Sequence, residues 1–128
     1  MPKEKVSPRG AKSILIIEDE RPLAHALELK MRHEGYQTTI AETGTEGLKE
    51  ATSGKHDLIL LDLILPEVDG FMILKEMKEK KIKATIVVLS NLGQEEDQRK
   101  AEEFGAVSYL VKSNVPLSDI VKKVKSLL

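Results

Sequence analysis

The chain has 128 residues with 20 basic and 21 acidic side chains, a formal net charge of −1, and no cysteine. The absence of cysteine excludes disulfides, cysteine-based zinc sites and thiol nucleophiles, and the balanced charge gives no overall field that would attract nucleic acid or an anionic membrane. No apolar stretch approaches the roughly 20 residues that span a bilayer, and the start lacks the apolar core of a signal peptide. We therefore expect a soluble, cytoplasmic protein with one domain and without a direct nucleic-acid or membrane partner.

The first twelve residues differ in composition from the rest of the chain. They are rich in Lys, Pro, Arg and Gly and show no hydrophobic periodicity. Such a segment buries little apolar surface, so residues 1–12 are expected to form a disordered leader, more simply a solvated tail than a contact for an acidic partner. The folded domain is expected to comprise residues 13–128.

From residue 13 onward, apolar runs that suit β-strands alternate with segments that suit helices. Continuous runs of Val, Ile and Leu bounded by polar residues are typical of strands buried on both faces of a parallel sheet. The predicted strands span residues 14–17, 38–41, 58–61, 86–89 and 107–111. The predicted helices span residues 23–31, 45–52, 71–77, 94–104 and 117–128.

Particular residues refine these helix predictions. Gly35 suits a helix C-cap, and Asp69 suits an N-cap. The 94–104 segment has helix-forming residues but almost no apolar stripe, which predicts a loosely held helix that is well placed to move. The apolar face of the last helix is expected to comprise Leu117, Ile120, Val121, Val124, Leu127 and Leu128.

The alternation of strands and helices predicts the fold class. Strands that alternate with helices over so short a chain form successive βαβ units with right-handed crossovers. We predict an α/β fold, a flavodoxin-like doubly wound (βα)5 parallel sheet with strand order 2-1-3-4-5. In this order the first and fourth strands flank the third, and ligands bind beyond the carboxyl ends of the strands.

Acids, a hydroxyl and a cation stand at the carboxyl ends of four predicted strands. They are Glu18, Asp19, Glu20, Asp62, Ser90 and Lys112. The predicted strand order brings Asp19, Asp62 and Ser90 side by side, and Lys112 must reach in from the edge strand. These residues are therefore expected to form one site although they lie far apart in the sequence.

The clustered carboxylates point to a divalent cation. Neighbouring carboxylates repel one another, and magnesium is usually held by one or two carboxylates plus a phosphate. Asp19 and Asp62 suit direct ligation, and Glu18 could act through water. The acidic triplet alone fits equally well a role in complementing a helix dipole. Asp62 closes so apolar a run that metal binding is favoured over a buried cap.

Ser90 and Lys112 supply a hydroxyl donor and a point cation. Such groups stabilise the oxygens of a phosphoryl group in a charged transition state. Each alone is weak support, because a serine that ends a strand is usually a turn former and a lysine there usually protects a sheet edge. His25, His33 and His56 lack metal-ligand spacing and are interpreted as surface or partly packed residues.

Four segments together resemble the receiver domains of bacterial two-component response regulators (CheY-like) from about residue 13 to residue 128. The segments are ILIIEDE (14–20), DLILLDLILPEVDG (57–70), VLS (88–90) and SYLVK (108–112). The resemblance implies that Asp62 accepts a phosphoryl group from the phosphohistidine of a histidine kinase or histidine phosphotransfer protein, or from a small acyl phosphate. It also implies that Glu18, Asp19, Asp62 and the main-chain carbonyl of Ile64 hold Mg²⁺.

The same resemblance implies a switch and an output surface. Ser90 would hydrogen-bond a phosphoryl oxygen, Lys112 would pair with it, and Tyr109 would swing inward as Ser90 moves. A downstream protein would bind the face formed by residues 94–128. The chain would catalyse its own phosphorylation and dephosphorylation without being an enzyme for external substrates.

One position departs from the family pattern. Many receivers have a proline after the active-site lysine with a cis peptide bond before it, whereas this chain has Ser113. A cis bond costs about 2.5–4 kcal/mol before a non-proline residue and about 0.5–1 kcal/mol before proline. The geometry of the Lys112-Ser113 peptide is therefore open. Pro116 is expected in the first turn of the last helix, with Ser113 or Asn114 as its cap.

Competing interpretations concern the extent and the activity of the protein. We expect a stand-alone receiver, with a receiver fragment of a longer regulator as the alternative. A magnesium-dependent phosphatase with Asp62 as nucleophile is less favoured. Such enzymes usually have a second aspartate two residues on, where this chain has Ile64.

Overall fold

The computed structural model describes residues 10–128 and contains a five-stranded parallel sheet. The strands are β1 (Ser13–Ile17), β2 (Gln37–Ala41), β3 (Leu58–Leu61), β4 (Thr85–Ser90) and β5 (Ala106–Val111). Their order in the sheet is β2-β1-β3-β4-β5, as predicted. The helices are α1 (Arg21–His33), α2 (Gly44–Ala51), α3 (Gly70–Glu79), α4 (Glu95–Glu103) and α5 (Leu117–Leu127), with a 3₁₀ turn, η1 (Lys112–Asn114), before α5.

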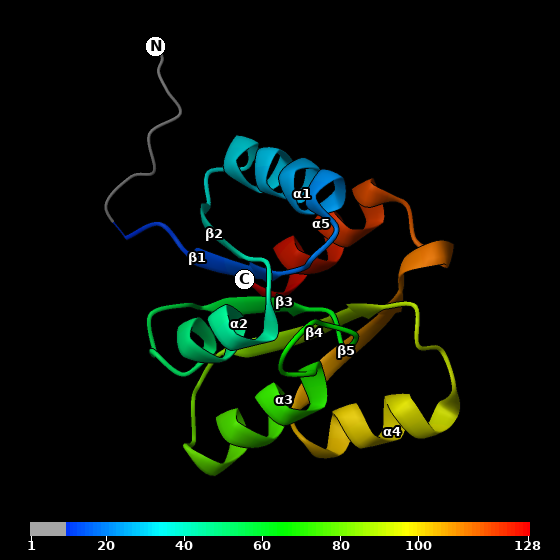
Figure 1. The fold of residues 1–128 in the computed structure, drawn as a ribbon. Helices are drawn as coiled ribbons and strands as arrows, with labels where there is room; N and C mark the ends of the chain where they lie inside the picture. Colours follow the sequence, from blue (N-terminus) through cyan, green and yellow to red (C-terminus); the bar gives the residue numbers. More distant parts are fainter. Residues whose placement is uncertain (1–9) are drawn as a thin grey trace.

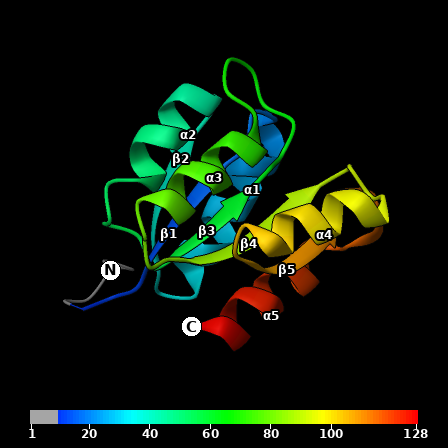
Figure 2. The same ribbon diagram turned by 90° about the horizontal axis from the view of Figure 1, so that it is seen from below.

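The helices form two layers, one on each face of the sheet. Figure 1 shows α1 and α5 on one face and α2, α3 and α4 on the other, and Figure 2 shows the latter three helices in front of the sheet. Each layer has its own apolar core, because successive side chains of a strand point to opposite faces. Leu15 and Ile59 pack toward α2, α3 and α4, whereas Ile14 and Leu58 pack toward α1 and α5.

The strand register places the ends of β1, β3 and β4 next to one another. Ile17 pairs with Leu61, so the next residues of the two strands, Glu18 and Asp62, stand at matching positions. On the other side, Leu61 pairs with Val88, which leaves Ser90 one residue beyond the level of Asp62. The predicted edge of the sheet is therefore where the polar side chains meet.

Helix ends agree with the sequence at two sites and differ at one. Gly35 follows α1 with a φ of 96°, and the Asp69 side chain caps α3 by accepting from the Met72 N–H at 3.0 Å. The prediction that Ser113 or Asn114 caps the last helix was wrong. Both residues lie in η1, and Pro116 itself occupies the N-cap of α5, because the 3₁₀ turn takes up the residues that were expected to open the helix.

The helices differ in how firmly their side chains hold them to the sheet. α4 buries only Ala101, in agreement with the predicted lack of an apolar stripe. α5 buries Ile120, Val121 and Val124, but Leu127, which was assigned to its apolar face, is 36% exposed. Leu127 is the last residue of α5.

Two further findings concern the predicted leader and the length of the helices. The predicted leader falls mostly in residues 1–9, which lie outside the described residues, while the Lys12 carbonyl accepts a hydrogen bond from the Gln37 N–H at 2.9 Å. Among residues 10–128, none of the helices is long and apolar enough to cross a membrane.

Gly70, the first residue of α3, lies close to the main chain of Asp62 and Leu63. A Cβ at this position would lie 2.6 Å from the Asp62 carbonyl oxygen and 2.6 Å from Leu63 Cα, both main-chain atoms. We expect Gly70→Ala to lower the free energy of unfolding by about 1–3 kcal/mol, since main-chain atoms cannot rotate away. Gly93→Ala is the control, because its Cβ would come no closer than 3.6 Å to Val111. Equal urea midpoints for the two variants would contradict this account.

Candidate functional site

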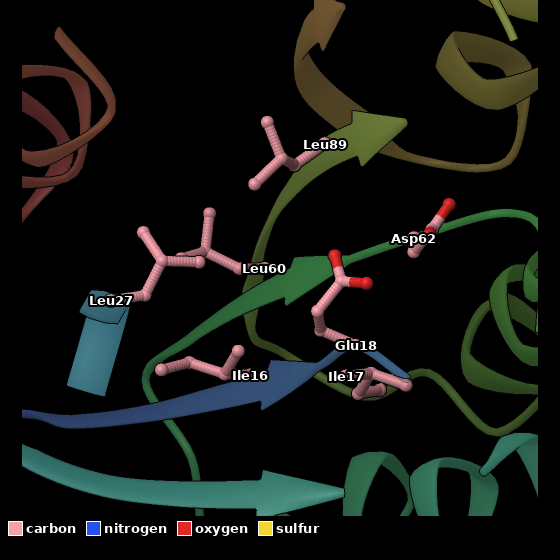
Figure 3. Close-up of a pocket in the computed structure, with 7 residues that line it drawn as sticks. All are labelled: Ile16, Ile17, Glu18, Leu27, Leu60, Asp62 and Leu89. Carbon is pink, nitrogen blue, oxygen red and sulfur yellow. The ribbon is translucent and has the colours of Figure 1, made fainter. Parts of the chain in front are cut away.

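Asp62 lies at the centre of the polar edge, directly after β3. Its main-chain N–H donates to the Ile17 carbonyl at 3.1 Å and so continues the pairing of β3 with β1 by one residue. Its side chain is only 5% exposed. Figure 3 shows Asp62 and Glu18 near the ends of β3 and β1, beside apolar residues that include Leu60 and Leu89. The apolar side chains on this side of the two carboxylates cannot donate hydrogen bonds to them.

Both oxygens of the Asp62 carboxylate accept hydrogen bonds. Oδ1 accepts from Ser90 Oγ at 2.9 Å and from the Ile64 main-chain N–H at 3.1 Å. Oδ2 accepts from Lys112 Nζ at 2.7 Å. Ser90 is fully buried, so its hydroxyl is held in place by the surrounding strands. The arrangement fixes the orientation of a buried carboxylate with two side-chain donors beside it.

Lys112 joins Asp62 to a second buried acid. Its Nζ lies 2.8 Å from Glu18 Oε1 and 2.7 Å from Asp62 Oδ2, and 3.7 Å from Glu20 Oε1 at the rim. Burial alone would lower the pKa of the Lys112 ammonium, but the hydrogen bonds that Lys112 donates to Asp62 and Glu18 outweigh it and raise the pKa. Burial raises the pKa of the Glu18 carboxyl, although the bond to Lys112 opposes the rise.

Three carboxylates converge closely enough to hold one cation. Oxygens of Glu18, Asp19 and Asp62 all lie within 4.8 Å of one another, with Asp19 exposed and the other two buried. Carboxylate oxygens suit Mg²⁺. The exposed side of the cluster, at Asp19, leaves room for the water ligands that Mg²⁺ keeps. Lys112 balances only part of this negative charge. The donor set therefore fits the predicted ion, and the contact of Glu18 with Lys112 suits its predicted indirect role.

The site opens to the surface through a small pocket. Its volume is about 150 Å³, and it is lined by Asp19, Glu20, Asp62, Ile64, Asn91 and Lys112. Ile64 is 55% exposed at the rim, and the role predicted for its main-chain carbonyl as a metal ligand stays a prediction. The pocket leads directly to the Asp62 carboxylate, so a small anionic group has access to it.

Tyr109 in β5 connects this edge to the loop that precedes α4. Its ring packs against the core beneath α2, α3 and α4, and its hydroxyl donates a hydrogen bond to the Leu92 carbonyl. Burial raises the pKa of the Tyr109 hydroxyl to about 12, with smaller contributions from the charges of Asp97 and Asp62. Leu92 lies two residues after Ser90, so the predicted switch residues contact the same loop.

The sequence did not predict a bond between Asn91 and Ser113. The Ser113 main-chain N–H donates to Asn91 Oδ1 at 3.0 Å, across the mouth of the pocket. No peptide bond among residues 10–128 is cis, so the Lys112-Ser113 peptide is trans. The only signal in the sequence was the departure at residue 113 itself, because a proline there would have no N–H to donate.

His56 illustrates a polar cluster outside the site. Its side chain is 6% exposed and lies between Ser13 Oγ and Glu50 Oε1, each 2.9 Å from a ring nitrogen. This arrangement agrees with the interpretation of His56 as a partly packed residue rather than a metal ligand. It joins the start of β1 to the end of α2, at the edge of the sheet opposite to Asp62.

We expect Lys112→Ala to destabilise the metal-free protein by about 3 kcal/mol, because Glu18 and Asp62 would stay buried without their cation. The loss should shrink as the pH falls through the raised pKa of Glu18, since the folded state then takes up a proton before the unfolded state does. Urea unfolding with a chelator present measures both effects. The matched control is Lys125→Ala, which removes a surface ion pair of 2.9 Å to Glu34 and should change stability little. Similar losses in both variants would contradict the role assigned to the buried pair.

Comparisons with known proteins agree with this geometry. Residues 14–125 match the family described as response regulator receiver domain. The chain is 33% identical over 115 residues to the response regulator ArlR of Staphylococcus saprophyticus, covering 90% of this chain and 51% of that protein. It is 35% identical to the transcriptional regulatory protein PcoR of Escherichia coli, covering 90% of this chain and 50% of that protein. The chain thus spans about half the length of these curated relatives.

Solved structures agree in fold. A CheY-like receiver domain protein from Methanospirillum hungatei superposes with a TM-score of 0.84 at 26% identity, covering 91% of this chain and 93% of that one. A response regulator from Burkholderia pseudomallei, solved with a phosphorylated aspartic acid, a calcium ion and citrate, gives a TM-score of 0.77 at 27% identity, covering 86% of this chain and 64% of that one. With its parallel sheet in the order 2-1-3-4-5 and its acidic pocket, the chain belongs to the receiver domain family of two-component response regulators.

Proposed function

We propose that Asp62 is the phosphoacceptor of this receiver domain and takes its phosphoryl group from a histidine kinase or a histidine phosphotransfer protein. The observation that carries the proposal is the Asp62 carboxylate, which is buried, reached through a small pocket, and contacted by Ser90 and Lys112 at 2.9 and 2.7 Å. A carboxylate oxygen attacks phosphorus while the bond from phosphorus to the nitrogen or oxygen of the donor breaks. The donor group leaves with that electron pair.

The side chains around Asp62 act by positioning and by charge. In phosphoryl transfer, negative charge on the peripheral oxygens is stabilised by fixed donors and cations. Lys112 and Ser90, which now donate to the carboxylate, would donate to phosphoryl oxygens after transfer. Mg²⁺ would be held by Asp19, Asp62 and the Ile64 carbonyl, with Glu18 acting through water. The ion would offset the negative charge of the incoming phosphate.

The signal is proposed to pass from Ser90 to the face formed by residues 94–128. If Ser90 moves toward a phosphoryl oxygen, the loop that ends at α4 moves with it, and the Tyr109 hydroxyl follows through its bond to the Leu92 carbonyl. α4 is anchored by one buried side chain, Ala101, so a change in this loop costs few core contacts. A downstream protein would read the altered surface of α4, β5 and α5.

Phosphorylation of Asp62 is tested with acetyl phosphate and magnesium. We expect the intact mass of the wild type to rise by one phosphoryl group and that of Asp62→Ala to stay unchanged. Asp57→Ala is the matched control, since Asp57 accepts from the Ser13 N–H at 2.8 Å, before β3, and should not affect labelling. Label that persists in Asp62→Ala would refute the assignment of the acceptor.

The coupling through Ser90 is tested separately from the chemistry. We expect Ser90→Ala to accept phosphate but to show a much smaller change in hydrogen exchange over residues 92–112 than the wild type, because only differential contacts shift a two-state population. Tyr109→Phe, which loses the hydroxyl bonded to Leu92, should give an intermediate response. A response of wild-type size in Ser90→Ala would rule out this route.

A further inference from the structure

The mouth of the pocket contains one side chain whose N–H donors the proposed chemistry leaves unused. Of the six side chains that line the pocket, only Lys112 and Asn91 carry donors, since the others are Asp19, Glu20, Asp62 and Ile64. Lys112 is already bonded to Glu18 and Asp62. Asn91 is exposed and follows Ser90 directly. Its carboxamide is therefore the neutral polar group of this opening.

The bond to Ser113 determines which way the Asn91 carboxamide faces. The partner at 3.0 Å is a main-chain N–H, which only donates, so the accepting atom of the amide is its oxygen. The NH₂ end consequently points away from Ser113. Within residues 10–128, Asn91 Nδ2 makes no hydrogen bond to another protein group. The amide is thus oriented by one end and leaves two N–H donors available.

The same bond connects the chain neighbours of the two residues that hold the Asp62 carboxylate. Asn91 is adjacent to Ser90, which donates to Oδ1, and Ser113 is adjacent to Lys112, which donates to Oδ2. The bond from Ser113 to Asn91 closes this ring of contacts across the pocket mouth. A group attached to Asp62 would extend into the space bordered by Asn91.

We propose that Asn91 is a phosphoryl-binding residue, whose Nδ2 donates to an oxygen of the phosphoryl group on Asp62, and that the Ser113 main-chain N–H is its positioning group. The inference rests on the proposed phosphoacceptor role of Asp62. A neutral amide adds a donor to an oxyanion without placing another charge among the carboxylates. A hydrogen bond to a charged acceptor of this kind corresponds to about a tenfold change in affinity.

The experiment measures the affinity for beryllofluoride, a phosphoryl mimic, in the presence of magnesium. We expect Asn91→Ala to weaken binding about tenfold relative to the wild type. Asn91→Asp should weaken it further, because the aspartate still accepts from Ser113 but offers a repelling oxygen in place of the donor. Asn114→Ala, at a neighbouring exposed asparagine in η1, should bind as the wild type does. If Asn91 acted only by accepting the hydrogen bond from Ser113, Asn91→Asp would bind beryllofluoride as tightly as the wild type. That result would overturn the proposal.

The role of Ser113 is tested by a double-mutant cycle and a spectroscopic signal. Ser113→Pro removes the N–H and should weaken binding more than Ser113→Ala, which keeps it. In the Ser113→Pro background, Asn91→Ala should lose most of its effect, because the amide is no longer held. The ¹⁵N-¹H₂ signals of the Asn91 amide should shift on addition of beryllofluoride in the wild type, and less in Ser113→Pro.

The outcomes separate this inference from the function on which it rests. If the wild type and Asn91→Ala bind beryllofluoride with equal affinity, and the Asn91 amide signal of the wild type does not shift on binding, the role of Asn91 alone is overturned. A wild type that neither binds beryllofluoride nor accepts phosphate would overturn the phosphoacceptor role of Asp62 and this inference together.

Discussion

The ammonium group of Lys112 lies between two buried carboxylates, Glu18 and Asp62, at 2.8 and 2.7 Å. Burial removes water from these charges, and breaking such a pair by loss of one partner is far more costly than loss of a surface pair. The raised pKa of Glu18 reflects the same burial. The carboxyl edge of the sheet is thereby a place where negative charge is concentrated and only partly balanced, which suits a divalent cation.

The connection between this edge and the rest of the surface is uneven. α5 is anchored by Ile120, Val121 and Val124, whereas α4 buries only Ala101. The loop before α4 contains Asn91 and Leu92, which bond to the Ser113 N–H and to the Tyr109 hydroxyl. These two hydrogen bonds connect the loop before α4 to η1 and to β5. α4 is therefore the helix with the fewest buried side chains to hold it against the sheet.

Sequence patterns predicted the sheet and its edge well because buried parallel strands have a simple signal. β1, β3 and β4 each contain a continuous apolar run, and the polar residue that follows such a run must lie at the carboxyl edge. The strand order was also correct, since short right-handed crossovers leave few alternatives for five βα units. The approach to α5 was predicted wrongly. A 3₁₀ turn and a helix cap compete for the same few residues there, and local preferences do not decide between them.

The sequence by itself determined which chemical groups reach the edge of the sheet, because hydrophobic periodicity and strand endings are local properties of the chain. Tertiary structure alone decided how those groups pair. Glu18 and Lys112 are 94 residues apart, and nothing in either segment indicates that the lysine contacts this acid as well as Asp62. The orientation of the Asn91 carboxamide likewise depends on a main-chain N–H 22 residues away. Hydrogen bonds and ion pairs require atoms to approach within about 3 Å, and such distances follow from the packing of whole elements rather than from the pattern of any one of them.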